Sequence, residues 1–207
     1  MHNKCVQSDS ARVVHLCAAR CAPFIAHKWP THALRLTQAL GQKMGNLITN
    51  KSIGQEDQLN ISNGSMSVLI SSLALSGSFL AKDEAEIEFM TWIVSRDQVI
   101  LGMGTVGFDL QDMPWSEKEA TFRKQKSFLL NVIQRVKSGV DLNLLKYEPK
   151  FLQQNVEDFE RMIRSFLYSH INLENSVVWM PPKEKQLKCE EHGVFLHEHG
   201  CVVCNDK

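Results

Sequence analysis

The sequence predicts a mainly α-helical protein with a small metal-binding module near its C-terminus. Apolar residues recur at helical spacing in three segments, which follow Asp83, Ser116 and Pro149. A short stretch at residues 58–70 alternates apolar and polar residues, which predicts a small β-hairpin. Residues 189–204 contain two closely spaced pairs of Cys and His, a pattern typical of metal sites.

The 207 residues divide into four expected parts. We expect residues 1–43 to form a basic N-terminal extension that the folded unit does not need, and residues 44–170 to form the helical domain. A polar linker with two consecutive prolines, residues 171–188, leads to the metal-binding module at 189–207. Residues 1–50 contain six Lys and Arg against one acidic residue, although the net charge of the chain is zero. This asymmetry is typical of a loosely attached terminus and also of a basic arm.

Residues 11–43 are compatible with one or two helices, broken at Trp29-Pro30 because proline cannot continue a helix. Cys17 and Cys21 are four residues apart and would share one helical face. Without a second pair of ligands nearby, we interpret these two cysteines as small buried side chains.

The predicted hairpin turns at Asn63-Gly64, because both residues tolerate the positive φ that a two-residue type I′ turn requires. The uncharged apolar run that follows, residues 66–81, contains five serines and is too short to cross a bilayer. We therefore expect no membrane association.

A first helix is predicted to start at Asp83, because Glu86 three residues later supplies a carboxylate at the N3 position. Its apolar stripe consists of Ile87, Met90 and Val94 and extends to about residue 98.

A second helix is predicted to start with a capping box at Ser116-Glu-Lys-Glu119. It should end at Ser138-Gly139, where glycine fits the left-handed C-cap. Its inner face is expected to contain five apolar residues, namely Phe122, Leu129, Val132, Ile133 and Val136.

The third helix, opened by Pro149, has the strongest pattern of the chain. Five apolar residues recur at spacings of four, three, four and three and define one stripe: Leu152, Val156, Phe159, Ile163 and Phe166. His170 is expected to end this helix, where a cation complements the carbonyl dipole.

The pairs Cys189/His192 and Cys201/Cys204 each have two residues between their members, and a link of eight residues joins the pairs. Four such ligands suit a tetrahedral Zn²⁺ ion. Over residues 189–204 only, the chain resembles the knuckles of zinc-ribbon and related zinc-finger modules. A closed shell of four protein ligands leaves no position for water, so the expected Zn²⁺ is structural rather than catalytic.

His197 and His199 are alternative ligands, since either could replace His192. We favour His192 because its spacing from Cys189 mirrors that of Cys201 and Cys204.

Residues 102–107, Gly-Met-Gly-Thr-Val-Gly, match the spacing of a dinucleotide-binding fingerprint. That motif requires a long helix after the last glycine, and Pro114 excludes one. We therefore reject nucleotide binding. The loop Gly102–Trp115 is still a candidate binding surface, with Asp109, Asp112 and Trp115 as its candidate residues. The competing interpretation is a solvated connection that its aromatic residues anchor.

The sequence contains no nucleophile elbow, no His-Glu-x-x-His motif and no P-loop. We expect a non-enzymatic, zinc-stabilised cytoplasmic protein that acts by recognising another protein. One alternative is a small nucleic-acid-binding regulator that uses the basic N-terminus and the zinc module. Another is an enzyme with its site in the Gly102–Trp115 loop. The partner, the process and the oligomeric state stay open.

Overall fold

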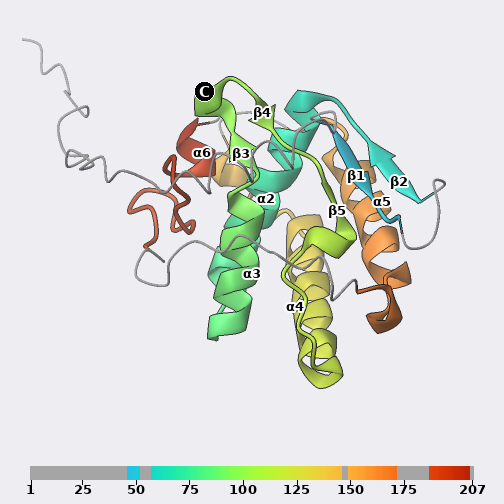
Figure 1. Cartoon of the computed structure of the whole chain (residues 1–207). Helices are drawn as coiled ribbons and strands as arrows, with labels where there is room; N and C mark the ends of the chain where they lie inside the picture. The colour runs from blue at the N-terminus through green and yellow to red at the C-terminus, as the bar shows by residue number, and fades with distance from the viewer. Residues whose placement is uncertain (1–45, 52–56, 146–148, 172–186, 206–207) are drawn as a thin grey trace, which may run out of the picture. The chain divides into compact units, whose positions relative to one another are not determined.

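The computed structural model describes residues 46–51, 57–145, 149–171 and 187–205 (Figure 1). All of them belong to one compact unit, Gln42–Lys207. The expected helices at residues 11–43, with Cys17 and Cys21, and most of the expected linker lie outside the described residues. Within the described part, the prediction of a mainly α-helical protein is confirmed.

The structure contains helices, short strands and single 3-10 turns. The α-helices are α2 (Asn63–Leu80), α3 (Glu84–Val94), α4 (Glu119–Lys137), α5 (Leu152–Ser165) and α6 (Val202–Asn205). The strands are β1 (Leu47–Thr49), β2 (Gln58–Asn60), β3 (Asp97–Gln98), β4 (Gly104–Thr105) and β5 (Phe108–Asp109). The 3-10 turns are Val99–Leu101, Leu110–Asp112, Leu142–Leu144 and Tyr168–His170.

Helix α2 is the centre of the unit and contacts α3, α4, α5 and α6 (Figure 1). Every residue from Leu69 to Ser78 is buried, so neighbours cover all sides of this helix. A helix in that position needs no polar face, which explains its run of Leu, Ala, Ser and Gly. A Cβ atom on Gly77 would lie 2.3 Å from the thioether of Met90. The glycine therefore allows α3 to approach α2 closely.

The hairpin predicted at residues 58–70 is wrong. Strand β2 ends at Asn60, and Asn63 and Gly64 form the first turn of α2 instead of a reverse turn. Ser62 caps that helix, because its Oγ accepts a hydrogen bond from the amide of Ser65 at 3.1 Å. The apolar run that follows gains more from burial as a central helix than as the second strand of a small hairpin.

The predicted start of α3 is confirmed: Asp83 and Glu86 form a reciprocal capping box. The predicted start of α4 is wrong by two residues, because the N-cap is Lys118 instead of Ser116. Ser116 accepts from the amide of Lys118 in a local turn, and the helix begins at Glu119. Its predicted end at Ser138-Gly139 is confirmed, with a φ of 72° at Gly139. All five residues predicted for its inner face are buried.

All five residues of the predicted stripe lie in the core, and four of them belong to α5, whereas Phe166 follows its last residue. The prediction that His170 ends this helix is wrong. The helix ends at Ser165, and the amide of Leu167 donates to Nδ1 of His170, which lies in a separate 3-10 turn. Phe166 already leaves the helical conformation, with a ψ of 120°.

Two small sheets flank the helices. The first has the order β2-β1-β5, with β1 antiparallel to β2 and parallel to β5. The second is the antiparallel pair β3-β4, in which Asp97 lies opposite Thr105. A Cβ atom on Gly107 would lie 2.1 Å from the carbonyl oxygen of Leu47. This glycine therefore serves close backbone packing, and 3-10 and strand segments follow it rather than the helix of a nucleotide site.

Candidate metal centre

A tight turn presents Cys189 and His192. The amide of Gly193 donates to the carbonyl of Cys189, and the amide of Cys189 donates to the carbonyl of Val194, both at 2.8 Å. Gly193 has a φ of 66°, a conformation that glycine adopts without a steric cost. The turn brings the two side chains to the same side of the chain.

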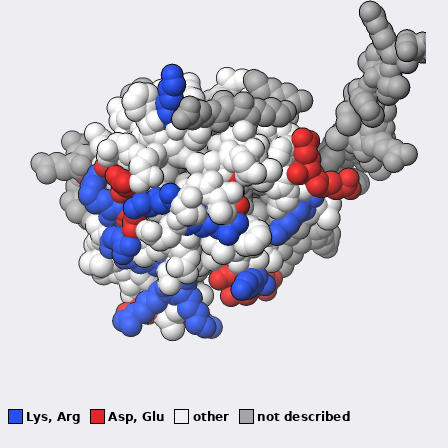
Figure 2. All heavy atoms as spheres, turned by 180° about the vertical axis from the view of Figure 1, so that it is seen from behind, with Lys and Arg blue, Asp and Glu red and all other residues white. Residues whose placement is uncertain are grey.

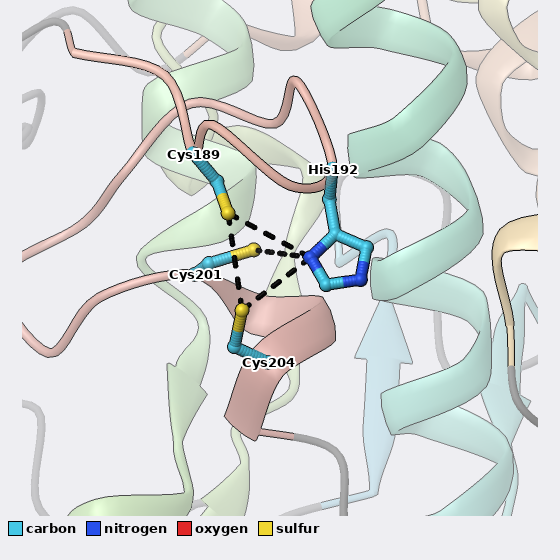
Figure 3. Close-up of side chains that lie close together, drawn as sticks. All are labelled: Cys189, His192, Cys201 and Cys204. Atoms are coloured by element: carbon cyan, nitrogen blue, oxygen red, sulfur yellow. Dashed lines mark hydrogen bonds between the residues drawn. The ribbon is translucent and has the colours of Figure 1, made fainter. Parts of the chain in front are cut away.

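The second pair comes from a turn followed by the short helix α6. His197 and Gly200 exchange backbone hydrogen bonds at 3.0 and 3.1 Å, and Gly200 has a φ of 104°. The amide of Asn205 then donates to the carbonyl of Cys201. Cys201 and Cys204 thus lie on one turn of helix and point toward the first pair (Figure 3).

The four predicted ligands lie together: one ligand atom from each is within 4.8 Å of all the others (Figure 3). Nδ1 of His192 is 3.6 Å from Sγ of Cys189, 3.8 Å from Sγ of Cys201 and 3.4 Å from Sγ of Cys204. The sulfur atoms of Cys189 and Cys204 are 3.8 Å apart. Among the residues that the structure describes, this is the one group of three or more Cys, His, Asp or Glu placed to share a metal ion.

The two alternative histidines point elsewhere. Nε2 of His197 lies 3.2 Å from Oδ2 of Asp97, and its Nδ1 faces the amide of His199 at 3.4 Å. Nε2 of His199 lies 3.3 Å from Oε1 of Glu198. His192 is therefore the histidine that the fold places beside the three sulfurs.

Without a cation, the thiols of Cys201 and Cys204 resist ionisation. Burial and the nearby thiols of Cys204 and Cys189 raise the pKa of Cys201 to about 12. Burial and contact with Cys189 also raise the pKa of Cys204. A bound metal ion reverses this preference, because it attracts the thiolate form directly.

The segment that contains the four predicted ligands, residues 187–205, packs into the same core as the helices. Val194, Phe195, Val202 and Val203 are buried members of that core. The amide of Phe195 donates to Oγ of Ser78 at 3.1 Å, and Nζ of Lys188 donates to the carbonyl of the same serine at 2.6 Å. The segment therefore packs against the C-terminal end of α2 and is hydrogen-bonded to it.

Asp97 connects the segment to the β3-β4 hairpin. Its Oδ2 accepts from Nδ2 of Asn205 at 2.8 Å and faces His197, while its Oδ1 accepts from the amide of Val99. Burial alone would raise the pKa of Asp97, but the contacts with His197, Asn205 and Val99 lower it below the ordinary value. Sequence reasoning missed this residue. The available signal was an isolated carboxylate before the uncharged stretch 98–108.

The three candidate residues of the Gly102–Trp115 loop make contacts within the fold. Asp109 is buried and accepts from the hydroxyl of Thr49 at 2.5 Å and from the amide of Gln111 at 3.0 Å. Asp112 accepts from the amide of Asp109, and Nε1 of the buried Trp115 donates to the carbonyl of Leu110 at 2.7 Å. A role of these residues in ligand binding stays a prediction.

The negative charge of Asp112 also affects the pKa of Arg96. Burial lowers the pKa of Arg96 to about 10, and the negative charge of Asp112 partly opposes this shift. The guanidinium lies over the ring of Trp92, 4.3 Å from its centroid, which supplies a further favourable contact. The guanidinium of Arg96 is therefore buried against Trp92 and feels the charge of Asp112.

Basic and acidic side chains are mixed on the face opposite to that of Figure 1 (Figure 2). The buried Glu160 pairs with Lys137 of α4 at 2.9 Å and with Arg164 of its own helix at 2.5 Å. No described helix is both long and apolar enough to span a bilayer.

Comparisons of the chain with protein-family models, with curated proteins and with solved structures gave no match, so the function has to be inferred from the site.

Proposed function

We propose that this chain is a non-enzymatic, zinc-stabilised protein of the cytoplasm that acts by recognising another protein. The observation that carries the proposal is the Cys₃His cluster. Zinc bonds of about 2.3 Å to sulfur and 2.0 Å to nitrogen, set at the tetrahedral angle, place two sulfurs about 3.8 Å apart and a sulfur about 3.5 Å from the nitrogen. In the cluster, the sulfurs of Cys189 and Cys204 are 3.8 Å apart, each of the three sulfurs is 3.4–3.8 Å from Nδ1 of His192, and all four ligand atoms lie within 4.8 Å of one another.

Four protein ligands saturate a tetrahedral zinc ion, which leaves no position for water or substrate. A site of this kind stabilises the fold instead of performing chemistry. Zinc must hold its three cysteines as thiolates, and a reducing compartment such as the cytoplasm keeps thiols available for that purpose.

The composition of the zinc-ribbon-like module favours a protein partner over nucleic acid. Residues 189–205 contain Glu190, Glu191 and Glu198 and no Lys or Arg. All three glutamates are exposed. Because nucleic-acid binding depends on cations that neutralise phosphates, this surface would repel the backbone of DNA or RNA.

Elemental analysis of the purified full chain tests the metal assignment. We expect about one zinc per chain, because the four ligands define one closed site. His192→Ala should abolish stoichiometric zinc, whereas the matched variant His199→Ala should retain it. A wild-type protein without bound metal, or equal losses in both variants, would contradict the proposal.

Retention on a phosphate-bearing column tests the choice of partner. A protein-binding module should show weak retention with little dependence on salt, whereas nucleic-acid binding gives a steep dependence from counterion release. Strong salt-dependent retention of the zinc-loaded chain would favour the alternative, a regulator that uses the basic residues 1–50.

A further inference from the structure

The tip of the β3-β4 hairpin exposes a run of large apolar side chains. The exposed fractions are 39% for Val99, 62% for Ile100, 53% for Leu101 and 53% for Met103. No charged residue occurs between Asp97 and Asp109. Single exposed apolar residues are ordinary on a protein surface, but four within five positions mark a site of interaction.

The backbone of this tip is fixed in position. The amide of Gly102 donates to the carbonyl of Val99 at 2.9 Å, and Gly102 has the φ of 75° that this turn requires. Below the tip, the amide of Val106 donates to the carbonyl of Arg96 at 2.8 Å. A preformed tip loses little conformational entropy on binding, which favours its use as a docking element.

The candidate metal centre supports the base of the same hairpin. Asp97 binds the first amide of the tip, at Val99, and at the same time contacts His197 and Asn205. These two residues flank the ligands Cys201 and Cys204. Metal binding fixes both ligands, so it also fixes the two groups that hold Asp97.

We propose that residues 99–103, the docking tip, insert into an apolar cleft of another protein whose rim carries Lys and Arg, and that the bound metal holds the tip in place. This inference rests on the proposed function and names its surface and the chemistry of its partner. Residues 97–117 contain no Lys or Arg, and their exposed charged side chains are Asp112 and Glu117, since Asp97 and Asp109 are buried. The exposed Glu198 follows His197, which contacts Asp97 at the base of the hairpin. Three thiolates around one Zn²⁺ add a further net negative charge. Basic residues on the partner complement this surface.

Two other occupants fit less well. Anionic lipid headgroups attract Lys and Arg near an inserting loop, and residues 97–117 supply none. A second copy of the chain would present the same exposed carboxylates and no basic rim, and like charges that face each other weaken association.

Site-specific photo-crosslinking with the full-length, zinc-loaded chain identifies the partner. p-Benzoylphenylalanine is placed at position 101 and, as a control, at position 151, because Phe151 is 76% exposed and lies outside the tip. The protein that crosslinks from position 101 alone is then purified and titrated against the chain. A crosslink from both positions, or from neither, overturns the proposal.

The titration compares Leu101→Asp with Phe151→Asp. We expect Leu101→Asp to raise the Kd by at least about tenfold and Phe151→Asp by less than about twofold, because buried apolar anchors dominate binding. Reversing the charge of Lys or Arg on the rim of the partner's cleft should also weaken binding. Equal effects of the two variants, or no effect of the charge reversal, overturn the assignment of the surface.

Three measurements separate the remaining outcomes. If the chain binds phosphatidylserine vesicles and Leu101→Asp abolishes this binding, the tip inserts into a lipid surface instead. If the chain forms a dimer that the same variant dissociates, the occupant is a second copy.

Chelation should weaken partner binding and increase amide exchange at residues 98–106, and added zinc should restore the wild-type binding and exchange. An unchanged Kd after chelation overturns the proposal that the metal holds the tip in place. Zinc content is measured on every sample. Loss of zinc from the wild type contradicts the proposed function, whereas intact zinc with an inactive tip contradicts this inference alone.

Discussion

Helix α5 and the segment 189–205 are buried in the same core, but different forces specify them. Helix α5 has four apolar residues of the predicted stripe on one face, and Phe166 follows directly, so its own sequence defines the surface that it buries. The segment 189–205 contains only one short helix, α6, and four residues are too few to form a stable helix alone. Its conformation depends on four ligands and on the remote residues Ser78 and Asp97.

This difference implies two kinds of failure. Damage to α5 removes apolar contacts of the whole core and should lower the global stability. Damage to the metal centre should release the segment 189–205 and leave the helices folded. The following experiments test this separation, beginning with the largest expected effect.

Chelation of the metal, or the substitution Cys201→Ser, should produce the largest effect. Structural zinc sites contribute on the order of 10 kcal/mol to the folding of the segments that they organise. We expect amides of residues 189–205 to lose protection from hydrogen exchange while those of α5 keep it. Simultaneous loss of protection in α5 would show that the two regions do not separate.

Phe159→Ala should have the converse effect. Phe159 is fully buried in α5 and its ring lies 6.3 Å from that of Phe108. Truncation of such a side chain typically costs about 3–5 kcal/mol. Denaturant unfolding should show this loss, whereas zinc content at low denaturant should stay at the wild-type level.

Ser78→Ala tests the hydrogen bond that joins α2 to the segment 189–205. The hydroxyl of Ser78 accepts from the amide of Phe195, and the substitution leaves this buried amide without a partner. The cost is about 1–3 kcal/mol. Exchange of residues 189–205 should increase, with a smaller increase in α5. The variant Ser71→Ala, at a buried serine of the same helix, serves as the control for changes within α2.

Glu160→Gln should have the smallest effect and a defined dependence on pH. Its hydrogen bond with Lys137 and its contact with Arg164 lower the pKa of Glu160. A carboxylate with a lowered pKa stabilises the fold above its unfolded pKa of about 4.3, and that contribution disappears as the pH falls further. The difference in unfolding free energy between wild type and variant should be at most about 1 kcal/mol at neutral pH and should shrink below about pH 4. A difference that grows in acid would contradict this assignment.

The same contrast explains what could be predicted from the sequence. The stripe of α5, the capping box at Asp83 and the end of α4 depend on residues a few positions apart, and all three predictions are confirmed. The grouping of Cys189, His192, Cys201 and Cys204 was also predictable, because the spacing of ligands is visible along the chain.

Other features could not be predicted, because one local pattern suits two structures or because the contacts join residues far apart in the chain. Ser62-Asn63-Gly64 suits a helix start as well as a reverse turn, and only the surroundings of α2 decide between them. At Ser116 the local pattern of a capping box was present, but the helix begins later. Asp97 and Asn205 are 108 residues apart, so no local pattern connects the docking tip to the metal centre.

The contact between Ser78 and Phe195 joins residues that are synthesised at different times. Phe195 is 117 residues after Ser78 in the chain, and Asn205 is 108 residues after Asp97. At a synthesis rate of about 5–20 residues per second, Phe195 and Asn205 leave the ribosome about 5–25 seconds after Ser78 and Asp97, the residues that they contact. During that interval the nascent chain exposes the end of α2 and the carboxylate of Asp97. Under the proposed function, zinc therefore binds to the segment 189–205 only after the helices that this segment packs against have been synthesised.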